Sequence, residues 1–246
     1  MQWETSSTIS TPADDHIHVW QAEFNQWRSR LGGLESMLDG DEIRRADRFL
    51  RLEDRERYVF AHGLLRRILG SCAGSGPPLL TFGTGPHGKP YLIREGSRGD
   101  HWSYNLSHSG DRILVAAIRE RPVGVDVERI SRSVEIESLS RRFFSAEEAD
   151  HILRQPETAR KAAFIDTWVC KEAFVKAVGE GLSMPLDSFS IEFDRNGTRI
   201  VRSRGKENPH LDRPWTLIRF SVAEDYSGAV AVGGEPPQVS GFLLVP

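Results

Sequence analysis

Two acidic residues, Asp126 and Glu128, stand at the end of the apolar segment 123–127. Side chains at positions i and i+2 of a strand point to the same face, so a strand here would project both carboxylates together and turn Val125 and Val127 toward the core. Two carboxylates held this close repel each other, and a hard divalent cation with oxygen ligands, most simply Mg2+, offsets the repulsion. An exposed strand end with two solvated acids is the alternative interpretation.

A second group of reactive side chains is predicted on a helix in the segment 168–182, WVCKEAFVKAVGEGL. Trp168, Glu172 and Lys176 are four residues apart and share one face of that helix, with Phe164 one turn earlier. A carboxylate and an ammonium then lie beside an aromatic stripe, where the acid is partly desolvated. An ordinary surface Glu–Lys pair, worth about 0.3 to 0.5 kcal/mol, is the alternative.

The segment 104–110, YNLSHSG, is expected to be a short loop between two strands. In such a loop Ser107 and His108 offer a hydroxyl and an imidazole, which can both donate to a phosphate. No acid is spaced to complete a nucleophilic triad, so the sequence disfavours a serine hydrolase. A turn or capping role for Asn105 and Ser107 is the alternative.

Two further motifs are interpreted as structural. In the segment 143–148, FFSAEE, Ser145 is the expected N-cap of a helix and Glu148 its N3 partner in an S-x-x-E capping box. His16 and His18 would suit a metal, but no third ligand accompanies them. We therefore interpret both histidines as ordinary strand residues.

Lysine is rare in this chain. Five of the 32 basic residues are lysines, and the remaining 27 are arginines. Lys89, Lys171 and Lys176 fall within short motifs, and a compact ammonium can approach a single phosphate oxygen or a reacting atom as a point charge. The pattern favours a phosphate-bearing ligand.

The composition limits the class of protein. The 246 residues are 39% hydrophobic and 27% charged, which is typical of a globular chain. A formal net charge of -3 disfavours a general nucleic-acid binder. Cys72 and Cys170 lack metal-like or redox-like spacing, and no segment approaches the roughly 20 apolar residues of a membrane span. We therefore expect a cytoplasmic protein that binds neither a membrane nor nucleic acid.

The hydrophobic pattern predicts two similar halves. A helical segment at 58–70, expected to end at Gly70, aligns without gaps on 168–180, and SGDRILVAAI near the end of the first half resembles SGAVAVGG near the end of the second. We interpret the chain as two α+β lobes, 1–121 and 122–246, with a ligand groove between them. Chance similarity is the alternative.

The elements that must position these side chains follow from periodicity and turn residues. Arg195-Asn196-Gly197 is a predicted hairpin turn. The expected strands are 16–24, 102–106, 113–118, 123–127, 189–193, 198–202, 215–222 and 228–232, and the expected helical segments are 41–70 and 145–179.

Five short blocks occur in an order that resembles one enzyme family. They are GKP at 88–90, NLSHSG at 105–110, GVDVE at 124–128, FFSAEE at 143–148 and WVCKEAFVKAVGEGL at 168–182, the last followed by PLDSFSI. Each block is weak alone, but the ordered set closely resembles the 4′-phosphopantetheinyl transferases of the surfactin-synthetase type. The resemblance covers about residues 44–192.

The resemblance implies a pseudo-dimer of two α+β lobes with the active site at the lobe interface. It implies magnesium-dependent transfer of the 4′-phosphopantetheine arm of coenzyme A to a serine of an apo acyl or peptidyl carrier protein, with release of adenosine 3′,5′-bisphosphate. A monomer is expected, because two lobes in one chain can form one complete cleft.

The same resemblance implies roles for individual residues. Asp126, Glu128 and Glu172 would hold Mg2+. The chemistry of the transfer adds the hypothesis that Glu172, directly or through a water, takes the proton from the carrier serine, while Lys176 steadies the pyrophosphate leaving group. An arginine-rich face would meet an acidic carrier, with candidates among Arg44, Arg45, Arg48, Arg51 and Arg66. For each of these arginines a solvated helix surface is the alternative. The residues implied to contact coenzyme A are Arg45, Arg57, Lys89, Ser107, His108, Lys171 and Lys176.

Two other functions fit parts of the pattern. A metal-dependent nuclease can use an acidic pair followed by a Glu and a Lys, although the net charge of -3 disfavours it. A coenzyme A sensing module would use the same binding residues with a silent metal site. The combination of Asp126, Glu128, Glu172 and Lys176 favours the enzyme.

Overall fold

The computed structural model describes residues 1–93, 101–130, 135–193, 198–203, 209–211 and 213–246. These residues form two compact units. The first contains Met1–Gly83, Pro90–Glu120 and Gln238–Pro246, and the second contains Thr84–Lys89 and Arg121–Pro237. The chain therefore changes unit after Glu120, close to the expected boundary, but its last segment belongs to the first unit. The hairpin turn predicted at 195–197 lies outside the described residues.

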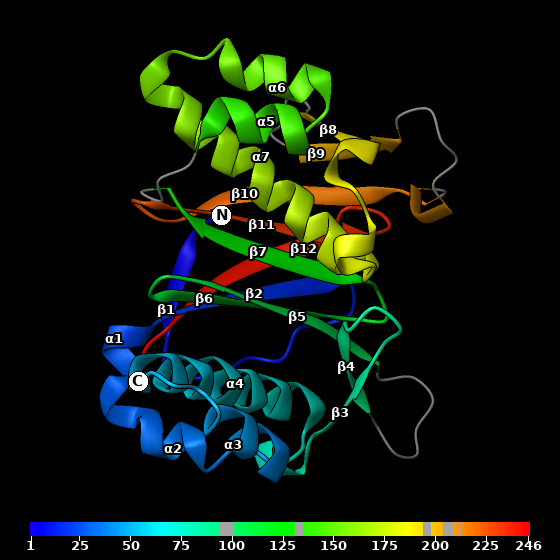
Figure 1. Cartoon of the computed structure of the whole chain (residues 1–246). Coiled ribbons are helices and arrows are strands. Elements are labelled where there is room, and N and C mark those ends of the chain that lie inside the picture. Colours follow the sequence, from blue (N-terminus) through cyan, green and yellow to red (C-terminus); the bar gives the residue numbers. More distant parts are fainter. Residues whose placement is uncertain (94–100, 131–134, 194–197, 204–208, 212) are drawn as a thin grey trace. The chain divides into compact units, whose positions relative to one another are not determined.

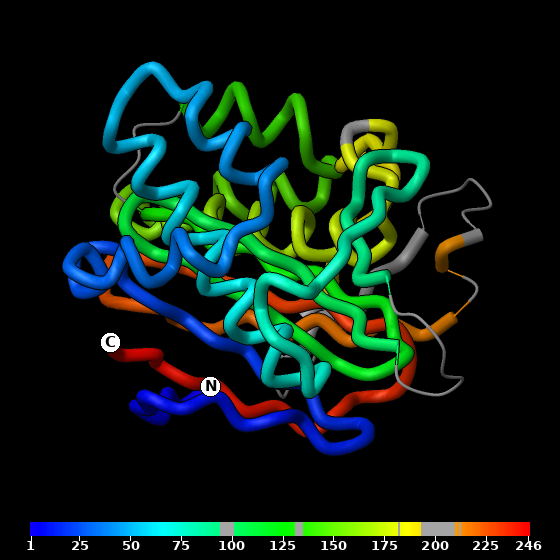
Figure 2. The backbone as a smooth tube through the Cα atoms, turned by 90° about the horizontal axis from the view of Figure 1, so that it is seen from below, coloured from blue at the N-terminus to red at the C-terminus, as the bar shows by residue number. Residues whose placement is uncertain are grey.

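The sheet of the first unit has five strands in the order β1-β12-β2-β6-β5. β12 runs parallel to both of its neighbours, and Figure 2 shows the red C-terminal segment beside the blue N-terminal one. Periodicity predicted β2, β5 and β6 but neither β1 nor β12, because pairing between opposite ends of a chain leaves no local signal. The strands are β1 (Trp3–Ser6), β2 (His16–Glu23), β5 (Trp102–Ser109), β6 (Arg112–Arg119) and β12 (Gln238–Leu244).

The long helix of the first unit, α4 (Leu52–Ala73), packs against the sheet of that unit (Figure 1). It does not end at Gly70 as expected but at Gly74, whose φ of 60° suits glycine. Gly70 instead permits close packing, because a Cβ there would lie 2.9 Å from the carbonyl oxygen of Ser75. The remaining elements of this part of the chain are α1 (Phe24–Trp27), η1 (Arg28–Arg30), α2 (Leu31–Glu35), α3 (Gly40–Ala46), η2 (Pro77–Leu79), β3 (Thr81–Thr84) and β4 (Pro90–Ile93).

The sheet of the second unit also has five strands, in the order β7-β11-β10-β9-β8 and antiparallel throughout. The helix α7 (Glu157–Val178) lies across β7 and β11 (Figure 1). The other elements are β7 (Val123–Arg129), α5 (Ile136–Phe143), α6 (Ala146–Leu153), η3 (Gly181–Ser183), η4 (Leu186–Ser188), β8 (Phe189–Phe193), β9 (Thr198–Ser203), η5 (Pro209–Leu211), β10 (Trp215–Ala223) and β11 (Tyr226–Gly233).

Each unit therefore combines a five-stranded sheet with one 22-residue helix, which confirms the predicted α+β fold of two similar lobes. Each also has its own hydrophobic core. In the second, Phe174 of α7 packs against Phe189 and Trp215 of the sheet, with ring centroids 4.8 and 5.0 Å away. Within the described ranges, no helix combines the length and apolar composition needed to cross a bilayer.

Candidate active site

The strand β7 and the helix α7 touch through their backbones at Gly124. A Cβ at this position would lie 2.1 Å from the carbonyl oxygen of Ala173 and 2.3 Å from the nitrogen of Ala177, so only glycine permits this approach. Because side chains alternate along a strand, Asp126 and Glu128 share the face of β7 that Gly124 turns toward the helix. The strand therefore presents both carboxylates to α7.

An ion pair joins the helix to this acidic strand. Nζ of Lys176 donates to Oδ1 of Asp126 at 2.6 Å, and the Asp126 side chain is only 5% exposed. Glu172, one turn earlier on α7, has a raised pKa, first because it is buried and then because Asp126 and Glu128 are close, while Lys176 opposes the shift. The structure thus gathers the four residues on one side of the second unit. Glu172 is partly desolvated, as the aromatic stripe predicted.

The donor types of this group suit magnesium, which prefers several hard oxygen ligands. The charges suit it as well, because Asp126 and Glu128 each make the Glu172 carboxylate harder to ionise. Among the described residues, however, no three His, Cys, Asp or Glu side chains are arranged closely enough to qualify as a metal-binding cluster. The amine of Lys176 supplies the positive charge beside Asp126 in this arrangement.

Lys89 fastens the end of α7 to the start of β7. Its ammonium donates to the carbonyl oxygens of Val123 and Ala177, both at 2.9 Å, and burial lowers its pKa to about 8. The resemblance implied that Lys89 contacts the phosphates of coenzyme A. In the structure it contacts backbone carbonyls of the protein instead.

Lys171 is also directed away from the acidic group. Its side chain is fully buried, donates to the carbonyl oxygens of Leu186 and Phe189, and forms an ion pair with Glu148. The structure therefore does not bring Lys171 together with Asp126 and Glu172, as a phosphate ligand would require. The predicted capping box of Ser145 and Glu148 is confirmed, since each side chain accepts from the other residue's backbone nitrogen.

Ser107 and His108 lie in the first unit, and the loop predicted for them is not formed. β5 continues through both residues to Ser109, because Ser107 and His108 pair with Leu114 and Ile113 of β6. Consecutive strand residues face opposite sides, and accordingly Ser107 is buried while His108 is exposed. The two side chains therefore do not converge as the loop would have allowed.

His108 and Arg57 line one cavity of about 220 Å³ in the first unit, together with the stacked rings of Tyr58 and His62. Arg57 is held there by the carboxylates of Glu53 and Asp111 and by the carbonyl oxygen of Gly110. Two of the predicted coenzyme A contacts are thus neighbours. The aromatic pair beside them was not anticipated.

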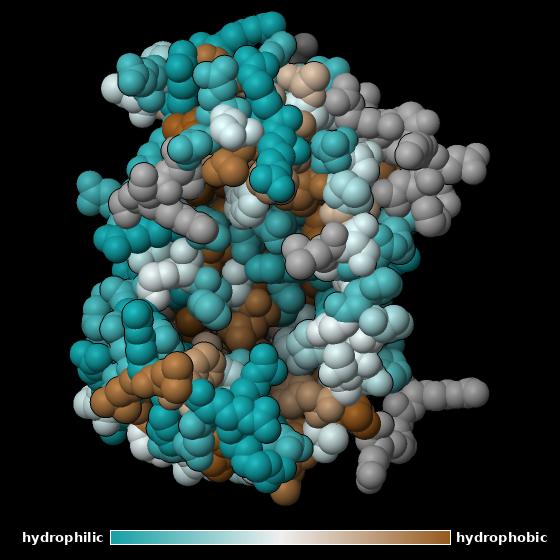
Figure 3. Space-filling model, in the orientation of Figure 1, coloured by the Kyte–Doolittle hydropathy of each residue, from teal (hydrophilic) through white to brown (hydrophobic). Residues whose placement is uncertain are grey.

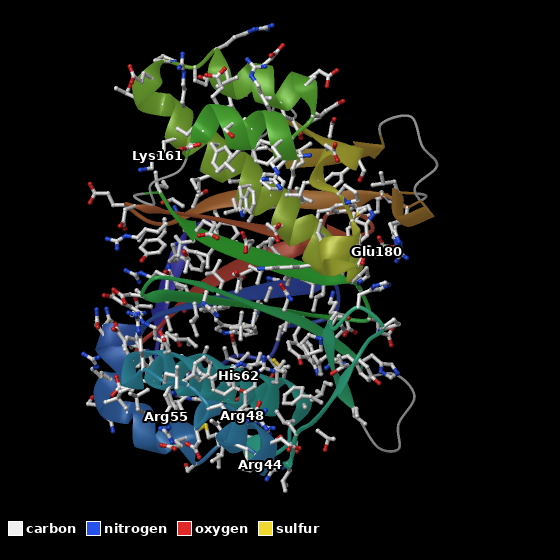
Figure 4. The ribbon with its side chains drawn as sticks, in the orientation of Figure 1. Arg44, Arg48, Arg55, His62, Lys161 and Glu180 are labelled. Atoms are coloured by element: carbon white, nitrogen blue, oxygen red, sulfur yellow. The ribbon has the colours of Figure 1, made fainter. Side chains whose placement is uncertain are left out.

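Arg45 borders an open hollow of about 520 Å³ at α3 and the residues that follow it, with Arg44, Arg48 and Phe49. Figure 4 labels Arg44 and Arg48 in this part of the chain. The guanidinium of Arg45 also lies 6.0 Å from the ring of Tyr58. Arg66, in contrast, is fully buried, where it pairs with Asp39 and Glu42. The suggestion that Arg66 could contact a partner protein is therefore wrong.

Family models match both halves of the chain. A family model described as the 4′-phosphopantetheinyl transferase superfamily matches residues 122–231, and one described as 4′-phosphopantetheinyl transferase, N-terminal, matches residues 18–120. The 4′-phosphopantetheinyl transferase HetI of Nostoc sp. (strain PCC 7120) is 35% identical over 237 residues, which cover 94% of each chain.

Two Bacillus proteins are also similar. The 4′-phosphopantetheinyl transferase psf-1 of Bacillus pumilus is 32% identical over 77% of this chain and 78% of its own. The 4′-phosphopantetheinyl transferase Sfp of Bacillus subtilis (strain 168) is 29% identical over 79% of this chain and 82% of its own. The chain belongs to the 4′-phosphopantetheinyl transferase superfamily, and the predicted enzyme class is confirmed.

Proposed function

We propose that this enzyme uses the acidic face of β7 and α7 to move the 4′-phosphopantetheine arm from coenzyme A to a serine of an apo acyl or peptidyl carrier protein. The observation that carries the proposal is the grouping of Asp126, Glu128, Glu172 and Lys176 within the second unit. Family membership supports the reaction, and the grouping supports these residues as the site at which it occurs.

Transfer of a phosphoryl-type group depends mainly on positioning and on neutralising charge. We assign Asp126, Glu128 and Glu172 as the residues that would hold magnesium, which when bound would neutralise the diphosphate of coenzyme A. Lys176, already beside Asp126, would steady the leaving phosphate of adenosine 3′,5′-bisphosphate.

Glu172 is the candidate general base. The bond between the serine Oγ and the β-phosphorus of coenzyme A forms, the bond from that phosphorus to the bridging oxygen breaks, and the serine proton passes to Glu172 directly or through a water. The position of Glu172 supports this role, because it lies beside Asp126 and Glu128 in the acidic group where the proposed reaction takes place.

For the nucleotide end of coenzyme A we propose contacts in the first unit. His108 and Arg57 border the cavity beside Tyr58 and His62, and Arg45 borders the neighbouring hollow that shares Phe49. Cationic and aromatic side chains suit a phosphorylated purine nucleoside. Lys89, Ser107 and Lys171 are left out of this assignment, because none of them lines the cavity or the hollow. Ser107 is a buried residue of β5.

The carrier protein would meet the exposed segment between α3 and α4. Phe49, Leu50 and Leu52 are exposed there, and exposed hydrophobic side chains are visible on the face shown in Figure 3. Arg48 precedes Phe49, and Arg51 lies between Leu50 and Leu52. Both arginines are exposed cations that suit an acidic partner. An ordinary solvated surface is the alternative.

The decisive experiment incubates the protein with coenzyme A, magnesium and an apo carrier protein and then weighs the carrier. A gain equal to one phosphopantetheine group supports the proposal, whereas a nuclease or a coenzyme A sensing module would leave the mass unchanged. Glu172→Gln should abolish the gain while thermal unfolding stays that of the parent. A Glu172→Gln protein that turns over at nearly the parent rate would exclude the general-base assignment.

A further inference from the structure

The ammonium of Lys171 has a complete set of partners inside the second unit. It offers three N–H groups, and three acceptors surround it: the carbonyl oxygens of Leu186 and Phe189, each at 2.7 Å, and Oε2 of Glu148 at 2.8 Å. Its charge also lies 4.3 Å from the ring centroid of Phe189. This arrangement leaves no N–H group over for a substrate phosphate.

Glu148 extends the same network to two further backbone sites. Its Oε2 accepts from the nitrogen of Ser145 at 2.9 Å, and its Oε1 accepts from the nitrogen of Ile191 at 2.8 Å. The Glu148 side chain is 8% exposed. The Glu148 carboxylate thus links the start of α6, the helix α7 and the strand β8. Its role therefore extends beyond the capping box of α6.

A buried side chain with fixed partners sets the rotation of the helix that carries it. Lys171 immediately precedes Glu172, and successive helical residues point about 100° apart. With Lys171 held toward β8 and η4, Glu172 and Lys176 are directed toward β7. The contact of Gly124 with the α7 backbone leaves no room for the helix to approach β7 further. The partners of Lys171 therefore fix the rotation of α7 about its own axis, and the contact at Gly124 fixes the distance of α7 from β7.

We propose that Glu148 and Lys171 form a positioning pair, which acts on the transfer reaction only by holding α7 so that Glu172 and Lys176 face Asp126. The proposal rests on the function assigned above to Glu172. It differs from the role that the family resemblance implied for Lys171, since it predicts that this lysine never touches coenzyme A.

The test compares Lys171→Met, Glu148→Gln and the double variant with the parent. Matched controls are Lys161→Met, near the beginning of the same helix (Figure 4), and Glu147→Gln, the exposed acid next to Glu148. For each protein, kcat and KM are measured by carrier mass, the Kd for coenzyme A by calorimetry, and the folded fraction by thermal unfolding. All assays are run well below the lowest Tm of the set.

We expect kcat to fall at least tenfold in each single variant, while the Kd for coenzyme A stays within twofold of the parent and both controls behave like the parent. The double variant should lose no more than the worse single variant, because both changes disable one network. Should either variant fail to fold, Glu148→Asp keeps the charge but shortens its reach toward Lys171, and it should lower kcat severalfold at unchanged Kd.

Two results would overturn the proposal. A Kd that rises tenfold in Lys171→Met with kcat retained would make the lysine a ligand of coenzyme A. A lower Tm with unchanged kcat in both single variants would make the pair a stabilising element without influence on the site. A parent protein that modifies no carrier is a separate failure, which would remove the proposed function itself.

Discussion

Lys176 on α7 donates to Asp126 on β7 across 2.6 Å, and this contact joins the helix to the acidic strand at the candidate site. The pair unites two short motifs that lie 50 residues apart in the chain. Neither residue is a plain surface charge, because the Asp126 side chain is 5% exposed and that of Lys176 29%. The contact therefore makes both residues informative targets for substitution.

Asp126→Asn should lower kcat/KM for carrier modification at least about 100-fold, or ~2.7 kcal/mol, and should raise the magnesium concentration needed for half-maximal rate. The amide keeps the shape of the side chain but removes a charged oxygen ligand. Rates measured over a magnesium titration check this, with Asp150→Asn on the exposed face of α6 as control. An unchanged titration curve would count against Asp126 as a metal ligand.

Gly124→Ala should reduce the free energy of unfolding by about 3 kcal/mol or more and abolish transfer. The added methyl group meets backbone atoms of α7, which cannot move aside as a flexible side chain would. Gly33→Ala in α2 is the control, since nothing lies within 4 Å of its new Cβ. Urea unfolding of both proteins decides the matter, and equal midpoints would contradict the close contact of β7 with α7.

Lys89→Met should lower the free energy of unfolding by about 1 to 2 kcal/mol and leave the Kd for coenzyme A unchanged. The substitution removes two hydrogen bonds to the backbone, one of them near the C-terminal end of α7. Urea unfolding and calorimetry with coenzyme A measure the two quantities. Weaker binding of coenzyme A at unchanged stability would indicate that Lys89 contacts the phosphates of coenzyme A.

His18 should make the first unit sensitive to acid. Its imidazole is buried beside Trp20 and Phe242, and burial followed by the neighbouring His16 lowers its pKa to about 4. The unfolded chain, with a pKa of about 6.5, binds a proton between pH 6.5 and pH 4 that the folded chain does not. The part of the stability that depends on His18 is therefore complete above about pH 6.5 and falls toward pH 4, by about 3 kcal/mol in total.

The check is urea unfolding of the parent and of His18→Gln at pH 7 and pH 4.5. The variant should lose less stability between the two values than the parent does. Acidic residues titrate in both proteins and cancel in the difference, so equal losses would show that His18 is not the responsible group.

Arg51→Glu should raise KM for the carrier protein about tenfold, or ~1.4 kcal/mol, with KM for coenzyme A unaffected. Reversing an exposed cation beside Leu50 and Leu52 replaces attraction for an acidic partner with repulsion. Arg154→Glu, exposed on α6, is the control. A carrier KM that moves equally in both variants would indicate general electrostatic steering rather than a docking surface.

Local spacing predicted two separate pairs of side chains, and only the family resemblance implied that the two pairs meet. Strand alternation placed Asp126 with Glu128, and helical spacing placed Glu172 with Lys176. The partners of Lys89 and Lys171 could not be predicted in this way, because both lysines donate to backbone carbonyls, which any residue type supplies. The sequence around Lys89 and Lys171 shows that a cation is present but does not show which groups the ammonium contacts.

The structure also differs from the sequence-based predictions at the segment 104–110 and at Arg66, in both places because of contacts with other elements. The glycine and serines of the segment 104–110 favoured a loop, but pairing with β6 extends β5 to Ser109, and the chain turns only at Gly110 and Asp111. A charged side chain such as that of Arg66 is usually exposed. Inside the first unit, however, Asp39, the N-cap of α3, and Glu42 of α3 compensate its charge. Tertiary partners overrode the local preference in both places.

The position of β12 between β1 and β2 has a consequence for biosynthesis. Among the described strands β1 pairs only with β12, so the sheet of the first unit stays incomplete until Gln238–Leu244 has left the ribosome. A fragment cut at the change of unit would expose the bare edge of β2 to aggregation. The sheet of the first unit can therefore close only after the segment Gln238–Leu244 has been synthesised.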